Sequence, residues 1–230
     1  MKISVIIPVW NEGKNIENLI SLLKKNDEDK LIGEIIIIDG NSEDDTIEIV
    51  KKLGIMVFQS PKTGRAPQMN FGALKSNYSI LFFLHADSIP PKNFGSRITD
   101  SVKNGFTGGC FRLKFDYDHL FLSLISWFTR FDNNTFRGGD QGLFIQKSTF
   151  EQIGGFNESY KICEDHEIIK RIKAKGKFDI IKDYVTTSAR RYNENGVYRL
   201  QLIFIYIKYL YYWRRRSPEE ILPVYKKYVK

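Results

Sequence analysis

The sequence predicts an α/β fold, a mostly parallel mixed sheet flanked by helices. Short apolar runs alternate with segments of helical period as far as Pro91, which is the pattern of such a sheet. The chain has 230 residues, of which 42% are hydrophobic, enough for the core of one domain. Polar residues follow several apolar runs, where the carboxyl ends of parallel strands would meet. No repeat or Pro/Gly-rich linker divides the chain.

The elements before Pro91 follow one another as strand and helix. They are expected as a strand over 3–8, a helix over 15–25, a strand over 34–39, a helix over 44–54, a strand over 55–60, a helix over 66–77 and a strand over 78–84. The strands are apolar runs, and the helices place apolar residues three and four apart. The first run is a core strand and not a signal peptide, because Pro8 breaks it and no small-residue cleavage site follows. Gly54 is a suitable C-terminal cap.

Beyond Pro91 the alternation is lost and the elements are mixed. A helix over 92–104, a strand over 108–115 and an apolar helix over 119–131 lead to the loop 132–142. A further helix is expected to begin near Glu164. No segment reaches the roughly 20 apolar residues that span a bilayer.

The charge of the chain limits the kinds of binding partner, and its cysteines indicate the cellular compartment. The formal charge of +8 suits an anionic partner such as nucleotide phosphates, nucleic acid or an acidic membrane surface. Lysine and arginine are scattered over helices and tail and form no stripe, so we expect no nucleic-acid partner. Cys110 and Cys163 have neither pairing nor metal-site spacing, so we expect two reduced, buried thiols and a cytoplasmic protein.

Acid and amide side chains stand where three predicted strands end. Asn11 and Glu12 follow the first strand, Asp39 ends the second, and Asp87 follows the fourth, in "FFLHADSIPP". Ligands of open parallel sheets bind at the carboxyl ends of strands. We therefore expect these residues to be neighbours in space, although each alone is also compatible with a solvated loop.

Several motifs resemble the family 2 glycosyltransferases. They are "SVIIPVWNE", "IIIIDGNSEDDT", "GRAPQMNFGA", "LHAD", "GGF" and "CEDHEIIKRIKAKGK", in the family's order and spacing. The chain is most similar to a bacterial subgroup with "HAD", "GGDQGLF" and "TSARR". The resemblance covers roughly residues 1–200. It implies a GT-A-type nucleotide-binding fold, with a catalytic domain over 1–196 and an aromatic, basic helical tail over 197–230.

The resemblance also implies an activity. It is the metal-dependent, inverting transfer of a sugar from a nucleoside diphosphate sugar, with UDP preferred, to an acceptor hydroxyl. "HAD" stands in for the family's Asp-x-Asp motif, so Asp87 is the expected ligand of Mg²⁺ or Mn²⁺, and His85 is a second candidate. The Glu-Asp pair of "CEDHE" implies Asp165 as the catalytic base. In a helix from Glu164, Asp165 shares the face of the apolar stripe that ends at Ile172.

Further residues are expected around the donor and the acceptor. Asp39 resembles the aspartate that receives the base, and the nucleotide would also be lined by Pro8, Trp10, Asn11, Glu12 and Ala86. Three arginines are candidates for the diphosphate: Arg65 at a helix start, and Arg190 and Arg191 in "TSARR". Asp140 and Gln141, in the glycine-rich "FRGGDQGLF", and Glu164 are expected in the acceptor or sugar pocket. Solvated arginines and a structural turn are the alternatives.

The tail and the acceptor leave alternatives open. "LQLIFIYIKYLYYWRRR" suits a membrane interface, and it equally suits packing on the catalytic domain or on a second copy in a homodimer. The acceptor is unknown; a lipid-linked one would place the protein at the inner face of the cell membrane. A nucleotidyltransferase, which releases pyrophosphate, and a catalytically silent, membrane-associated binding protein are the alternative functions.

Overall fold

The computed structural model describes residues 1–229 and confirms the predicted α/β fold. Its strands are β1 Ile3–Val9, β2 Ile32–Asp39, β3 Met56–Gln59, β4 Ile80–Phe83, β5 Ser88–Ile89, β6 Phe106–Phe115, β7 Leu143–Gln146 and β8 Lys177–Thr187. Its α-helices are α1 Gly13–Asn26, α2 Thr46–Lys52, α3 Arg65–Lys75, α4 Phe94–Lys103, α5 Leu120–Phe128, α6 Lys147–Gln152, α7 Glu164–Lys175, α8 Arg190–Asn195, α9 Val197–Tyr212 and α10 Pro218–Tyr228. Two 3₁₀ turns are η1 Asn134–Phe136 and η2 Gly139–Gln141.

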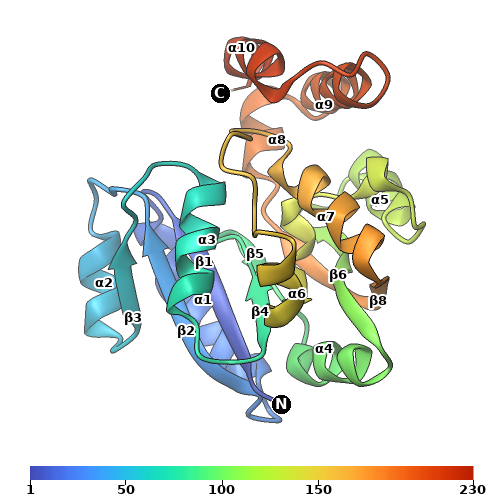
Figure 1. The fold of residues 1–230 in the computed structure, drawn as a ribbon. Helices are drawn as coiled ribbons and strands as arrows, with labels where there is room; N and C mark the ends of the chain where they lie inside the picture. Colours follow the sequence, from blue (N-terminus) through green and yellow to red (C-terminus); the bar gives the residue numbers. More distant parts are fainter. Residues whose placement is uncertain (230) are drawn as a thin grey trace.

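One sheet runs through the molecule in the order β3-β2-β1-β4-β7-β6-β8-β5 (Figure 1). The neighbours β3, β2, β1 and β4 are parallel, as the alternation before Pro91 predicts. The second half is mixed, because β7 runs antiparallel to both β4 and β6, whereas β8 is parallel to β6. The carboxyl ends of the first four strands therefore share one edge.

Helices cover both faces of the sheet, and strand residues alternate between them. In β1, Val5 and Ile7 belong to the core cluster that includes α1 and α4, whereas Ile6 belongs to the cluster that includes α3 and α7. All three side chains are fully buried. A central strand between two helical layers needs apolar residues on both faces, which is why the run in β1 is continuous.

The observed boundaries differ from the predicted ones by up to three residues at most element ends, and at α2 the reason is a specific contact. The helix expected from residue 44 begins at Thr46, because the Asp44 carboxylate instead accepts hydrogen bonds from the N–H of Gly13 (3.0 Å) and of Thr46 (3.1 Å). The loop 132–142 contains η1 and η2. Of the two thiols expected to be buried, Cys110 is buried but Cys163, at the start of α7, is only half-buried.

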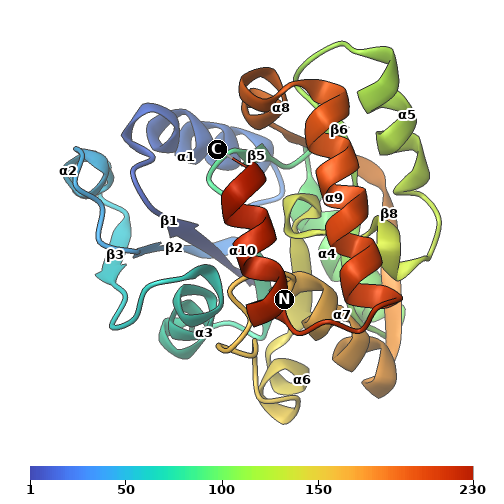
Figure 2. The same ribbon diagram turned by 90° about the horizontal axis from the view of Figure 1, so that it is seen from above.

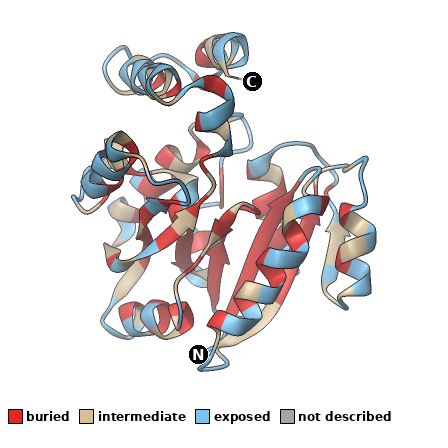
Figure 3. Cartoon of the chain, turned by 180° about the vertical axis from the view of Figure 1, so that it is seen from behind, coloured by how far each residue is buried: buried red, intermediate tan, exposed pale blue. Residues whose placement is uncertain are grey.

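The C-terminal helices lie over the carboxyl ends of the parallel strands. In Figure 1, α8, α9 and α10 lie above the sheet edge to which β1 and β4 point, and Figure 2 shows α10 crossing over that edge. Burial decreases in the same direction, since the strands in Figure 3 are red and the last two helices are largely pale blue and tan. Within residues 1–229, each helix is too short or too polar to cross a membrane.

Candidate active site

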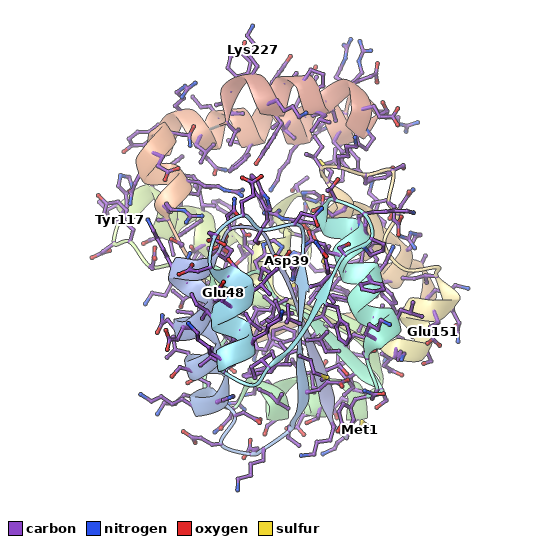
Figure 4. All side chains as sticks on the ribbon, turned by 90° about the vertical axis from the view of Figure 1, so that its left-hand side faces the viewer. Met1, Asp39, Glu48, Tyr117, Glu151 and Lys227 are labelled. Carbon is purple, nitrogen blue, oxygen red and sulfur yellow. The ribbon has the colours of Figure 1, made fainter. Side chains whose placement is uncertain are left out.

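Hydrogen bonds connect the loops after β1 and β2 near Asp39. Its side chain is buried, and its carboxylate accepts hydrogen bonds from the backbone N–H groups of Asn41 and Ser42, both at 3.0 Å. Asn11 adopts a φ of 54°, and its Oδ1 accepts a hydrogen bond from Glu43 N at 2.8 Å. Figure 4 shows Asp39 below the tail helices. Asp39 therefore lies at the carboxyl edge of the parallel strands, with its carboxylate hydrogen-bonded to its own loop.

The other residues expected around the nucleotide differ in exposure. Pro8 lies inside β1 and is buried, and Ala86 is also buried. Trp10 is 64% exposed, so its ring is free to meet a ligand. Glu12 is half-buried, with its Oε1 3.9 Å from Nη2 of Arg190 on α8. One arginine of "TSARR" therefore reaches the loop after β1.

The "HAD" segment follows β4 and carries a possible metal site. His85 is buried, and its Nδ1 lies 2.8 Å from Oδ1 of Asp140 in η2. Asp87 is half-buried, and Ser88 Oγ donates a long hydrogen bond (3.3 Å) to its carboxylate. One ligand atom from each of His85, Asp87 and Asp140 lies within 4.8 Å of the others. Two carboxylates and an imidazole are a donor set that fits a divalent cation such as Mn²⁺.

His85 and Asp140 shift each other's proton affinity. Burial and the charge of Arg65 disfavour protonation of His85, but the hydrogen bond and charge of Asp140, with the charge of Asp165, outweigh them and raise its pKa. Burial acts to raise the pKa of Asp140, yet the bond and charge of His85 hold that pKa below its usual range. The hydrogen bond between the two side chains therefore favours a protonated imidazole beside an ionised carboxylate.

Helix α7 presents two further acids at its first turn. Cys163 precedes it with a φ of 62°, Glu164 is buried and Asp165 is half-buried. Oε1 of Glu164 lies 4.0 Å from Nη1 of Arg65, at the start of α3. Burial and the neighbouring Glu164 raise the pKa of Asp165 to about 7. A carboxylate with a pKa near the working pH is suited to take a proton from a hydroxyl group.

At Gly139, His85 of the possible cation-binding group lies close to Asp165. A Cβ atom built on Gly139 would lie 2.5 Å from Oδ2 of Asp165 and 2.6 Å from Nε2 of His85. Both atoms therefore border the same small volume beside the backbone of η2. The sequence places them 80 residues apart, and the loops after β4 and before β7 and α7 close that gap.

The Gly139→Ala variant should lose most of its activity. The new methyl would displace Asp165, His85 or η2, and a displacement of about 1 Å at a reacting group can cost about 100-fold in rate. The measurement is kcat/KM for nucleoside diphosphate release. Gly138→Ala is the matched control, because a Cβ there meets nothing within 4 Å. Equal activity of the two variants would contradict this view of the site.

Arg137 and Gln141 hold η2 from beneath. The guanidinium of Arg137 is buried and donates hydrogen bonds to Cys110 Sγ at 3.3 Å and to backbone carbonyls at the end of α5, including that of Phe131 at 2.8 Å. Gln141 is also buried, and its Oε1 accepts a hydrogen bond from Gly138 N at 3.2 Å. In this structure Gln141 supports the loop and is not part of an open pocket wall.

Arg191 and the tail lie over the carboxyl edge of the parallel strands. Arg191 is half-buried and donates a long hydrogen bond (3.5 Å) to the hydroxyl of Tyr225 on α10. On α9, Lys208 Nζ donates to Thr135 O at 2.6 Å, and the Tyr212 hydroxyl donates to Asn134 O at 3.1 Å. The inner side of the tail therefore packs on the loop that leads to η2. This is one of the two arrangements that the sequence leaves open.

Acid should weaken this packing through His166. Its Nδ1 lies 2.9 Å from the Tyr212 hydroxyl, and burial, with the charge of Lys208, lowers its pKa to about 3. Below about pH 6.5 the unfolded chain binds a proton there that the folded chain does not, so stability falls from about pH 6.5 towards about 3. At pH 5 the loss should be about 2 kcal/mol. Urea unfolding at pH 7 and 5 measures it. His166→Gln should remove this loss of stability between pH 7 and pH 5, whereas His119→Gln should keep it. If both variants lost the same stability between the two pH values, the assignment to His166 would be contradicted.

The structure adds two residues to those that the sequence suggested for the metal and its support. Asp140, which we expected in the acceptor or sugar pocket, lies within the metal cluster. Arg137 has no role in our sequence analysis. The two glycines after it were the available signal, since they mark a loop that approaches other groups closely.

Residues 4–151 match the family model described as Glycosyl transferase family 2. Glycosyltransferase AglE of Haloferax volcanii is 29% identical over 106 residues, which are 44% of this chain and 35% of that protein. Probable glycosyltransferase YdaM of Bacillus subtilis is 25% identical over 195 residues, 74% of this chain and 46% of that protein. The chain thus spans less than half the length of these relatives. The family match ends before α7, so it does not include Asp165.

Solved structures agree on the fold. Mannosyltransferase PcManGT from Pyrobaculum calidifontis, in complex with GDP-Man and Mn²⁺, superposes with a TM-score of 0.70 and 16% identity, covering 97% of this chain and 67% of that chain. Staphylococcus aureus TarS 1-349, in complex with UDP, superposes with a TM-score of 0.69 and 19% identity, covering 89% of this chain and 65% of that chain. The fold is therefore of the GT-A type that the motifs imply.

Proposed function

Because this chain belongs to glycosyl transferase family 2, we propose that it transfers a sugar from a nucleoside diphosphate sugar to an acceptor hydroxyl. The observation that carries this proposal is the convergence at Gly139. There Nε2 of His85, which with Asp87 and Asp140 could hold a cation, lies beside the same point as the carboxylate of Asp165. A displacement at the anomeric carbon needs charge neutralisation at the leaving group and a base at the incoming hydroxyl.

The donor would lie along the carboxyl edge of the parallel strands. Asp39 would receive the base, which we propose to be uracil, after its carboxylate exchanges a hydrogen bond of its own loop for a base N–H. Trp10 is exposed beside it. The three arginines Arg65, Arg190 and Arg191 would face the diphosphate, because forked guanidinium groups suit phosphate oxygens.

Asp87 would hold the metal, with His85 and Asp140 as further ligands. Two carboxylates suit Mg²⁺ or Mn²⁺. A bound divalent cation would supply neutralisation of the negative charge that grows on the departing diphosphate. His85 must give up its hydrogen bond with Asp140 if its Nδ1 is to become a ligand.

Asp165 would act as the base in a single displacement. The acceptor oxygen forms a bond to the anomeric carbon while the bond from that carbon to the diphosphate oxygen breaks, and the hydroxyl proton goes to Asp165. The electron pair of the broken bond leaves with the diphosphate, and the anomeric configuration inverts. Asp140 and Glu164 would border the acceptor, and Gln141 would support that wall from below.

We also propose a division of labour along the chain. Residues 1–196 would form the catalytic domain and residues 197–230 an appended tail. A lipid-linked acceptor, and work at the inner face of the cell membrane, are supported by the exposed aromatic residues and the arginines of the tail. A homodimer formed through the tail is the alternative.

The test is product identity. The full chain is incubated with UDP- and GDP-sugars and with Mn²⁺ or Mg²⁺, and released nucleotides are measured. We expect a nucleoside diphosphate, fastest from a UDP-sugar, and at least about 100-fold less after chelation of the metal. A parallel incubation contains a nucleoside triphosphate and a sugar 1-phosphate instead, and pyrophosphate release there would favour a nucleotidyltransferase. Binding of the donor with metal but without any release would favour a silent binding protein.

A further inference from the structure

Helices α5 and α9 each carry an exposed apolar stripe. On α5 and the turn after it, the stripe consists of Leu120, Leu124, Trp127, Phe128 and Phe131. On α9 and the residue after it, the stripe consists of Tyr198, Leu202, Ile205, Tyr206, Tyr209 and Trp213. Both follow the three-and-four spacing of one helix face. We call the two stripes together the α5–α9 surface.

The fold leaves much of this surface exposed. The opposite faces of the two helices already pack inward, through Leu122 on α5 and through Leu200 and Ile207 on α9. The rings of Phe121 and Tyr198, with centroids 5.0 Å apart, join the two helices near their N-terminal ends. Figures 1 and 2 both show α5 and α9 on the same side of the molecule. Apolar patches of this extent on a protein surface mark interaction sites.

Most charges around the surface are positive, although Asp116 and Asp118 line the same hollow as Trp127 and Arg130. Residues 119–131 and 195–218 contain no aspartate or glutamate. Arg130 stacks on Trp127 at 4.6 Å, and Arg214 and Arg215 follow α9 as exposed cations. Asp118 and Asp132 flank α5 outside the stripe, and Asp132 is paired with Lys173. An occupant of the surface must therefore be apolar where it meets the rings and negative at the edge.

We propose that the α5–α9 surface docks on the face of an anionic lipid bilayer. Tyr and Trp rings sit at headgroup depth, leucines reach the acyl boundary, and arginines meet lipid phosphates. The helices of the described chain are too short or too polar to span, so they would lie in the interface plane. A second copy suits the surface less well, because a twofold contact would present the same two stripes, whose helices hold no acidic residue to pair with Arg130, Arg214 and Arg215.

This docking would put the membrane beside the reaction centre. The outer face of α9 forms the surface, whereas Lys208 on its inner side bonds Thr135, next to the loop that leads to η2. A lipid-linked acceptor would then reach the proposed reaction centre past the edge of one helix. This use of the surface depends on the proposed function, but bilayer binding itself does not depend on catalysis.

The test is flotation of the full chain with vesicles, without donor or metal. We expect binding to phosphatidylcholine vesicles that contain phosphatidylglycerol, weaker binding at high salt, and little binding to phosphatidylcholine alone. Leu202→Ser should weaken binding about tenfold, whereas Leu74→Ser, on α3, should not, although Leu74 is 76% exposed and Leu202 65%. The double variant Arg214→Gln/Arg215→Gln should weaken vesicle binding about 20-fold. The matched double variant Lys24→Gln/Lys25→Gln, on α1, should weaken it much less.

The outcomes separate this inference from the proposed function. Nucleotide release in vesicle-free solution should be unchanged in the Leu202 and arginine variants, and melting temperatures should match the wild type. Absence of binding to the anionic vesicles would overturn the inference, as would an equal effect of Leu202→Ser and Leu74→Ser. A dimer in sedimentation that Leu202→Ser dissociates would also overturn it and would assign the surface to a second copy. None of these results would alter the nucleotide-release assay.

Discussion

Replacing Asp165 with asparagine is expected to lower the rate of sugar transfer by about 10²–10⁴-fold, because the amide cannot take the proton of the acceptor hydroxyl. The side chain keeps its size, so the contacts around Gly139 should persist. The KM for the donor and the affinity for UDP with Mn²⁺ should change little. The assay is steady-state nucleoside diphosphate release with the donor that gives the fastest turnover.

Stability provides the check on Asp165→Asn. Burial and repulsion by Glu164 raise the pKa of Asp165, so removing its charge should leave the melting temperature unchanged or raise it. Asp100→Asn, on the exposed side of α4, is the matched control and should retain full activity. Near-normal turnover of Asp165→Asn would reject the assignment of the base. Loss of activity together with unfolding would show a structural role instead.

The second large effect is expected for Asp87→Ala. A bound divalent cation would supply several kcal/mol of charge stabilisation, so losing the main ligand that we propose for it should lower turnover by about 10³-fold. Binding of Mn²⁺ in the presence of UDP, followed by titration calorimetry, should weaken in the same variant. Asp87 has one long hydrogen bond to its carboxylate among residues 1–229, so its removal should cost little stability.

Comparison of the two variants makes the assignment sharper. Asp165→Asn should keep Mn²⁺ binding and lose turnover, whereas Asp87→Ala should lose both. Asp183→Ala removes an aspartate that pairs with Arg97 on the surface, and it should change neither. If Asp87→Ala bound Mn²⁺ as well as the wild type does, the metal would have to be held elsewhere.

The sequence predicted the parts of the fold that follow from local pattern. The continuous apolar run of β1 and the acids after β2 and β4 indicated a parallel sheet with polar groups at one edge, and the structure and the family match confirm that sheet and the family. The start of α7 at Glu164 also agrees with its apolar spacing. These features depend on residues close together in the sequence, so they can be predicted without a structure.

The remaining features depend on contacts between distant segments. Nothing local indicates that Asp140 would meet His85, because η2 follows the part of the chain where the alternation is lost. The hydrogen bonds from its own loop to the Asp39 carboxylate could not be predicted from the sequence either. The composition of α9 predicted a helix, but its inner side is defined by Lys208 and Tyr212, which bond the loop 132–142.

The most direct test of the central claim is the position of a bound cation. A crystal of the full chain grown with UDP and Mn²⁺ would be measured for anomalous scattering at the manganese absorption edge. The account predicts one strong peak within bonding distance of the Asp87 carboxylate and of the UDP diphosphate, with Asp165 beside the same site. A nucleotide bound along the strand ends without such a peak, or a peak far from Asp87, would contradict it.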